Sequence, residues 1–189
     1  MILLCYNLTG DIMYKYIYKT NDHFDDIILL SDGLNLTGLY FINSYTLPKD
    51  LINYKYNDLD IFKNVSLYLD NYFNGLNPKV NFNYKLNISS FAKEVLDILI
   101  SIPYGTTITY GDIAKSIASK RNVYKMSAQA VGHAVGTNPL SIIIPCHRVV
   151  GSNNNLVGYS GKIKNKVELL KLEGVDINKS IIPKKGKKL

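Results

Sequence analysis

One cysteine of this chain lies between residues that can change the chemistry of its thiol. Cys146 follows Pro145 and precedes His147 and Arg148, in the run IIIPCHRVV. A neighbouring imidazole or guanidinium lowers the pKa of a thiol, and the thiolate is the form that acts as a nucleophile. The surroundings of Cys146 therefore predict a lowered pKa of its thiol, and a nucleophilic Cys146 is one interpretation of the pattern.

Spacing alone leaves other roles open. A cysteine after an apolar run is often a small buried hydrophobic residue. Neighbouring side chains of an extended segment also point to opposite sides, so adjacency does not place His147 against the sulfur. Zinc binding is disfavoured, because the cysteines (5 and 146) and histidines (23, 133 and 147) show no ligand spacing such as Cys-x-x-Cys. We expect no metal site.

The segment before Cys146 sets the position of the thiol. Residues 140–144 are almost wholly apolar, and Pro145 has no backbone N–H and disfavours helical geometry in the residue before it. The pattern predicts a buried, strand-like run that emerges directly into Cys146, with no helix through this point.

The second half of the chain carries four helical patterns. Residues 91–102 form an apolar stripe behind Ser89-Ser90, residues 110–119 follow Thr109, residues 127–135 are rich in small side chains, and the last helix covers residues 164–172. The polar stretch 120–125 joins two of these short helices. This order is the outline of a helix-turn-helix, a common DNA-binding motif.

The first half is predicted to be mainly strands. Residues 12–18 and 34–42 are aromatic and β-branched, with turns at Gly10-Asp11 and Asp32-Gly33, and residues 61–73 form an amphipathic helix. A linker over residues 77–86 follows. We expect an α+β chain with a first domain over residues 1–85, a second over 86–175, and a basic tail over 176–189.

Charge divides the chain at the same point. Residues 1–85 carry seven Lys and nine Asp, a net charge of −2, whereas residues 86–189 carry fifteen Lys or Arg and six Asp or Glu, a net charge of +9. A polyanion would therefore bind the second half. No apolar run is long enough to cross a bilayer, and the N-terminus lacks the basic leader of a signal peptide. We expect a cytoplasmic, monomeric protein with no membrane partner.

Several motifs together resemble one family. The run IPCHRVV is preceded by Asn138-Pro139 and followed by GYSG at residues 158–161. ITYGDIA at 108–114, QAVGHAVGTNP at 129–139 and KLEG at 171–174 extend the similarity over residues 91–174. This set resembles the O6-alkylguanine-DNA alkyltransferases, or methylated-DNA–protein-cysteine methyltransferases. The resemblance implies a ribonuclease-H-like first domain, by length and element order only, and a winged-helix-like, helix-turn-helix second domain.

The resemblance also implies a reaction. Cys146 would take the alkyl group from O6 of guanine, with O4-alkylthymine as a further candidate, and keep it irreversibly. His147 would draw off the thiol proton through a water, and Glu173 would orient that imidazole. Asn138 would brace the active-site turn, and Tyr110 would donate a proton to N3 of the leaving guanine. Taken on its own, without the resemblance, Glu173 is better read as a solvated residue at a helix end. No cofactor is required.

Further residues take binding roles by the same resemblance. Backbone groups of Cys146, Val149 and Ser160 would hold the base, in a pocket that Tyr159 and Gly161 help to form. The base must be flipped out of duplex DNA to reach the thiol. Gln129 stands where the family has an arginine finger, which implies weaker binding of the duplex. The other expected DNA contacts are Ala128, Ala130, Gly132, Arg121, Lys125 and Arg148, the last of which could instead be a structural ion-pair partner.

Three rival functions follow from the same residues. Alkyltransferase-like proteins bind lesions without a reactive cysteine, and the presence of Cys146 argues against that class. A Cys–His hydrolase would turn over many times and would need an oxyanion hole. A helix-turn-helix regulator would use the basic half alone.

Overall fold

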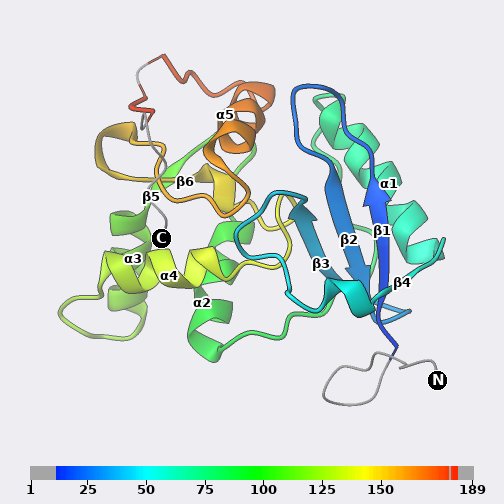
Figure 1. The fold of residues 1–189 in the computed structure, drawn as a ribbon. Coiled ribbons are helices and arrows are strands. Elements are labelled where there is room, and N and C mark those ends of the chain that lie inside the picture. The colour runs from blue at the N-terminus through cyan, green and yellow to red at the C-terminus, as the bar shows by residue number, and fades with distance from the viewer. Residues whose placement is uncertain (1–11, 179, 183–189) are drawn as a thin grey trace.

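The computed structural model describes residues 12–178 and 180–182 (Figure 1). The predicted turn at Gly10-Asp11, Cys5 and most of the basic tail lie outside the described residues. The chain forms a mixed α+β fold, as the sequence predicts. Among the described helices, none has the length and apolarity that crossing a bilayer demands.

The first half builds a four-stranded sheet. Its strands are β1 (Tyr14–Tyr18), β2 (Ile27–Ser31), β3 (Leu36–Phe41) and β4 (Lys55–Tyr56), in the order β3-β2-β1-β4. β2 pairs antiparallel with both of its neighbours, and β4 pairs parallel with β1. Strand β2 is missing from the sequence prediction. It is an apolar run buried on both faces, which has no alternation to reveal it.

Both faces of this sheet are covered. α1 (Asp60–Phe73) covers one face, on the right of the molecule in Figure 1. Its buried Phe62, Val65 and Leu69 belong to the same hydrophobic cluster as the sheet residues. The other face is covered by the segment after β3, which includes the 3₁₀ helix η1 (Leu51–Asn53). The predicted helix over residues 61–73 is therefore confirmed within one residue.

The second half contains the remaining helices. These are α2 (Ser90–Ile100), α3 (Tyr110–Lys120), α4 (Ala128–Gly136) and α5 (Ile163–Leu172). Each of the first three begins after a capping hydroxyl, that of Ser89, Thr109 or Ser127, which accepts a hydrogen bond from the backbone N–H three residues on. β5 (Ile108–Thr109) and β6 (Val149–Val150) form a short parallel pair, and the 3₁₀ helix η3 (Ser152–Asn154) follows.

The two halves share one hydrophobic core. A single cluster of buried side chains runs from strands β2 and β3 through helices α1 to α4 and on to α5. The edge of β3 is also hydrogen-bonded to the second half, since the amide of Leu39 donates to Pro139 and its carbonyl accepts from Ser141. The segment 139–141 is thereby fixed against the sheet.

The segment before Cys146 corrects the sequence prediction. Residues 141–144 form turns rather than an extended run, and Ile142 has a φ of 70°. Cys146–Arg148 is a 3₁₀ helix, η2. Pro145 precedes this helix, where a missing N–H costs nothing, so proline is compatible with the helical turn that the sequence prediction excluded.

Candidate active site around Cys146

Asn138 organises the turn that carries the thiol. Its side-chain Nδ2 donates to the sulfur of Cys146 at 3.0 Å and to the carbonyl of Ile144 at 2.8 Å, while its Oδ1 accepts from the amide of Leu140 at 3.0 Å. The Asn138 side chain is itself buried. One amide therefore fixes both ends of the turn and contacts the reactive atom.

Glu173 lies at the centre of a buried polar cluster. Its Oε1 is 2.8 Å from Nε2 of His147, and Arg148 binds both carboxylate oxygens, through Nε at 2.8 Å and Nη2 at 2.9 Å. The hydroxyl of Tyr72 donates to Oε1 at 2.6 Å. A further donor is the amide of Gly105 at 3.3 Å. The carboxylate is thus saturated with hydrogen-bond donors, and it is not the solvated residue that a helix end could suggest.

The charges in this cluster can be assigned. Burial lowers the pKa of His147 below its usual value, against the opposing effect of Glu173, so the imidazole is neutral near pH 7. Burial raises the pKa of Glu173, but hydrogen bonds from its neighbours outweigh this and lower it to about 2. Because His147 is neutral, the positive charge that keeps Glu173 ionised is that of Arg148. His147 Nδ1 is buried and makes no hydrogen bond to a described residue.

The predicted lowering of the Cys146 pKa is wrong for this state of the protein. Cys146 is only 3% exposed, and burial raises the pKa of its thiol. The hydrogen bond from Asn138 and the positive charge of Lys166 both act to lower it, without overcoming burial. His147 and Arg148 do not lower the pKa of the Cys146 thiol as expected, because neither offers it a free positive charge. His147 is neutral, and the charge of Arg148 is taken up by Glu173.

The GYSG segment is tightly packed, and burial raises the pKa of its Tyr159, to which the charge of Cys146 contributes. Tyr159, Ser160 and Gly161 are buried, and the carbonyl of Ser160 accepts from the amide of Tyr45 at 3.0 Å. A Cβ added at Gly161 would come within 2.7 Å of the Phe41 ring and 2.8 Å of the Tyr159 ring. Only glycine fits at this position.

Tyr110 closes another side of the site. It is the first residue of α3, is half-buried, and donates from its hydroxyl to the carbonyl of Gly158 at 3.0 Å. Burial raises the pKa of Tyr110, and the charge of Cys146 acts in the same direction. The phenol therefore keeps its proton at neutral pH.

The expected DNA-contacting residues of α4 do not share one environment. Ala128 and Gln129 are exposed at the start of the helix, and Ala130 is half-buried. Gly132 is buried and faces the Tyr110 ring, so that a Cβ added at Gly132 would lie 3.8 Å from that ring. Gly132 is therefore not among the exposed residues at the start of α4, and its expected contact with DNA stays a prediction.

The basic residues also divide. Arg148 is buried, and besides Glu173 it donates to the carbonyl of Ile102 at 2.6 Å, so it is a structural ion-pair partner and not a DNA contact. Arg121 is held by Glu94, with Nη2 at 2.6 Å from Oε2. Lys125 is exposed.

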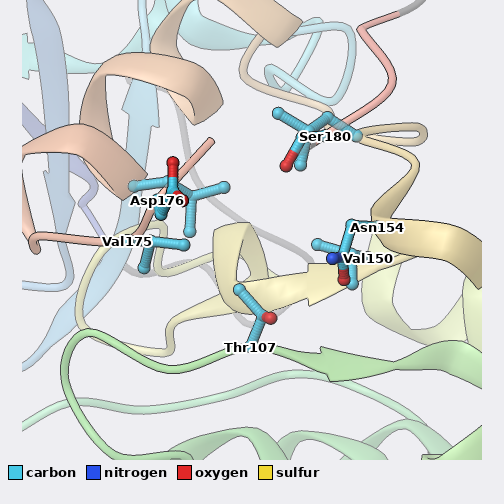
Figure 2. Close-up of a pocket in the computed structure, with 8 residues that line it drawn as sticks. Thr107, Val150, Asn154, Val175, Asp176 and Ser180 are labelled. Carbon is cyan, nitrogen blue, oxygen red and sulfur yellow. The ribbon is translucent and has the colours of Figure 1, made fainter. Parts of the chain in front are cut away.

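A small pocket lies apart from the thiol. It has a volume of about 40 Å³ and is lined on one side by Thr107, Val150 and Asn154, with Asp176 facing them (Figure 2). None of its lining residues belongs to the cluster around Cys146. Within residues 12–178 and 180–182, no three His, Cys, Asp or Glu side chains gather as a metal site would need.

Two buried residues of the site were missed by sequence reasoning. Tyr72 reaches Glu173 from the first half, and it is one of fifteen tyrosines with nothing in the sequence to single it out. Lys166 is wholly buried on α5, whereas lysine side chains are mostly exposed in folded proteins. The available signal was its spacing, since Lys166 is three residues after Ile163 and four before Leu170, on the apolar face of the helix.

Known proteins match both the sequence and the structure. Residues 90–175 match the family described as 6-O-methylguanine DNA methyltransferase, DNA binding domain. The methylated-DNA–protein-cysteine methyltransferase of Haemophilus influenzae is 36% identical over 150 residues, which cover 79% of this chain and 80% of that protein. The enzyme of the same name from Methanosarcina mazei is 37% identical over 164 residues, covering 85% and 97%. The chain belongs to the methylated-DNA–protein-cysteine methyltransferase family.

The resemblance carried by IPCHRVV and GYSG is therefore confirmed. A solved member of the methyltransferase family, Mycobacterium tuberculosis OGT in complex with DNA, matches the structure with a TM-score of 0.70. It is 30% identical and covers 89% of this chain and 94% of its own. The match extends beyond the DNA-binding segment, so the β-sheet half of this methyltransferase also follows the family fold.

Proposed function

We propose that this chain repairs alkylated DNA by direct reversal, with Cys146 as the acceptor of the alkyl group. The observation that carries the proposal is the contact of Asn138 with the Cys146 sulfur, next to the buried pair of His147 and Glu173. A nucleophile, an adjacent base and a group that orients the base are the parts that covalent catalysis requires.

In the proposed reaction, the thiol proton passes to His147 through a water, and the unpaired Nδ1 is the nitrogen available to receive it. The sulfur donates an electron pair to the alkyl carbon, and the bond from that carbon to O6 breaks. Its electrons remain on the guanine, which takes a proton at N3. Tyr110 is the proposed donor, and its hydroxyl would leave the carbonyl of Gly158 to act.

Backbone groups around the thiol are proposed to recognise the base. The carbonyls of Cys146 and Val149 would accept from the exocyclic amine of guanine, and the amide of Ser160 would donate to O6. Tyr159 and Gly161 shape this pocket. The carbonyl of Ser160 already accepts from the amide of Tyr45, which fixes the peptide between Ser160 and Gly161.

Helices α3 and α4 are proposed to act as a helix-turn-helix on DNA. The exposed start of α4, with Ala128 and Gln129, would lie along the duplex, and Ala130 would border the contact. Lys125 would contact phosphate. Gln129 would fill the space left by the flipped base without adding charge. We also propose that the sheet half has a ribonuclease-H-like fold. The protein is proposed to act as a monomer.

The proposed mechanism requires that the buried sulfur of Cys146 become accessible to the base. Because Cys146 is 3% exposed, the base can reach it only if the side chains that cover the sulfur move aside. We propose that entry of the base drives this movement, and that removal of water from the site accompanies it.

Mass spectrometry tests the proposal directly. The protein is incubated with duplex DNA containing O6-methylguanine, and a gain of one methyl group on the Cys146 peptide is expected, at no more than one per molecule. C146A is the matched control and should gain none. Tight binding without a mass change would instead indicate a lesion-binding module, and release of product in many turnovers would indicate a hydrolase.

A further inference from the structure

Lys166 is a wholly buried cation with no acidic partner in the described part of the chain. It lies on α5 at 0% exposure, and its Nζ donates to the carbonyl of Val149 at 2.6 Å and to that of Val157 at 3.0 Å. Burying an ammonium group without a counter-charge is unfavourable. Its presence therefore calls for a compensating interaction.

The electrostatic partner of Lys166 is Cys146. Burial lowers the pKa of Lys166 to about 8, and the Cys146 thiolate is the group that opposes this effect. The reverse also holds, since the charge of Lys166 lowers the pKa of the Cys146 thiol. His147, the other titratable group that senses Lys166, is neutral and offers no competing negative charge.

The two carbonyls bound by Lys166 belong to segments that border the thiol. Val149 directly follows η2, the helical turn that carries Cys146. Val157 directly precedes the GYSG segment. A single side chain therefore ties together the two segments between which the proposed pocket must form.

We infer that Lys166 is a positioning residue that supports the Cys146 thiolate by its charge and holds the segment after Cys146 to the GYSG segment. This inference rests on the proposed function for its biological meaning. Its physical content is a charge coupling between two buried groups. Alkyl transfer converts the sulfur anion to a neutral thioether, so it deprives Lys166 of that partner.

The first experiment compares the pH dependence of Cys146 reactivity in two lysine variants. K166M removes the buried charge and keeps the apolar stem. K164M removes an exposed charge two residues away on the same helix. Reaction with iodoacetamide and methyl transfer from an O6-methylguanine duplex are each followed from pH 6 to 10.

We expect K166M to react about tenfold more slowly than the unaltered protein at pH 7, and to recover at high pH, because an opposite charge nearby lowers a thiol pKa by about one unit or more. K164M should follow the unaltered profile. An equal loss for K166M at every pH, with no change in the midpoint, would show a merely structural role and overturn the inference.

The second experiment uses the unaltered protein, so it holds even where K166M does not fold. The protein is labelled with lysine that carries ¹³C at Cε, and one Cε signal is expected to titrate at a pH of about 8. After Cys146 is blocked with iodoacetamide, that signal should titrate at lower pH. Absence of such a signal, or its titration unchanged by the block, would contradict the coupling.

The iodoacetamide measurements also separate the two proposals. A pH midpoint that depends on Lys166, in a protein that gains no methyl group from DNA, would refute the proposed repair reaction and leave the inference on Lys166 standing. Methyl transfer from DNA with a pH midpoint that does not depend on Lys166 would support the proposed repair reaction and refute the inference on Lys166.

Discussion

The hydroxyl of Tyr72 donates a 2.6 Å hydrogen bond to the Glu173 carboxylate across 101 residues of sequence. Tyr72 belongs to α1, which covers the sheet of the first half, whereas Glu173 ends α5. The same hydroxyl is 3.4 Å from Nε2 of His147. The first half of the chain therefore supplies a side chain to the polar cluster beside the thiol.

Y72F should weaken both stability and transfer. The variant removes a hydrogen bond to a buried charged group, which lowers the free energy of unfolding by about 1.5–3 kcal/mol. Transfer of methyl to Cys146 should slow several-fold, because Glu173 orients His147 less firmly. Urea denaturation and single-turnover kinetics measure the two effects. Y56F, at an exposed tyrosine, is the control, and equal behaviour of the two variants would refute the role of Tyr72.

E173Q should be more damaging than Y72F. Glutamine keeps the shape of the side chain but leaves the Arg148 charge buried without a partner, which costs about 3–5 kcal/mol. Thermal or urea unfolding measures the loss. Methyl transfer should fall at every pH, since the imidazole of His147 loses its orienting anion. A variant as stable as the unaltered protein would contradict the assigned charge pair.

Acid should destabilise the unaltered protein in two stages. The folded-state pKa of His147 lies below its usual 6.5, and that of Glu173 falls from 4.5 to about 2. Both groups bind protons more readily when unfolded, so stability is present at neutral pH and decreases as pH falls. The first loss begins below pH 6.5, and the second spans pH 4.5 to about 2. Unfolding midpoints against pH should lack the second stage in E173Q.

Q129R should tighten binding to duplex DNA by several-fold. Gln129 is exposed in the first turn of α4, so an arginine there can reach the DNA and add a positive charge. The slope of the logarithm of the binding constant against the logarithm of the salt concentration should become steeper by about one for each additional phosphate that the arginine neutralises. Fluorescence anisotropy with a labelled duplex measures both. Weaker binding by Q129R would contradict the prediction that Gln129 lowers the affinity for duplex DNA relative to an arginine at this position.

The two basic residues of the turn before α4 should behave differently. K125A removes an exposed charge, so duplex affinity should fall and the salt slope should drop by about one. R121A removes the anchor of this turn on Glu94 and α2, so its main effect should be on stability. Anisotropy and urea denaturation, run on both variants, give the comparison. A pure affinity loss in R121A would show that the ion pair opens on DNA.

The helices were predictable because their signals are local. Ser89, Thr109 and Ser127 mark three helix starts that the structure bears out, and α1 and α5 lie within one residue of the predicted ranges. Strand β2 was not predictable in the same way. Its residues face apolar neighbours on both sides, and those neighbours come from distant parts of the chain.

The candidate site divides along the same line. Cys146, His147 and Asn138 are close in sequence, and they lie in the motifs by which the chain resembles its family. The state of the thiol is not local, because its pKa depends on burial and on Lys166. The role of Arg148 is not local either. A basic residue in the basic half of the chain suggests a DNA contact, and only the structure shows that Arg148 forms an ion pair with Glu173.

The hydrogen bonds from the edge of β3 to residues 139–141 have a consequence for how the protein comes apart. The strand edge, Tyr72 and the common core join the half that carries Cys146 to the sheet half at several points. A chain that begins at residue 86 would lose the hydrogen bonds from β3 that fix residues 139–141. It would also expose the hydrophobic side chains that pack against the first half. We therefore expect one cooperative melting transition for the whole chain, and aggregation of an acceptor half produced alone.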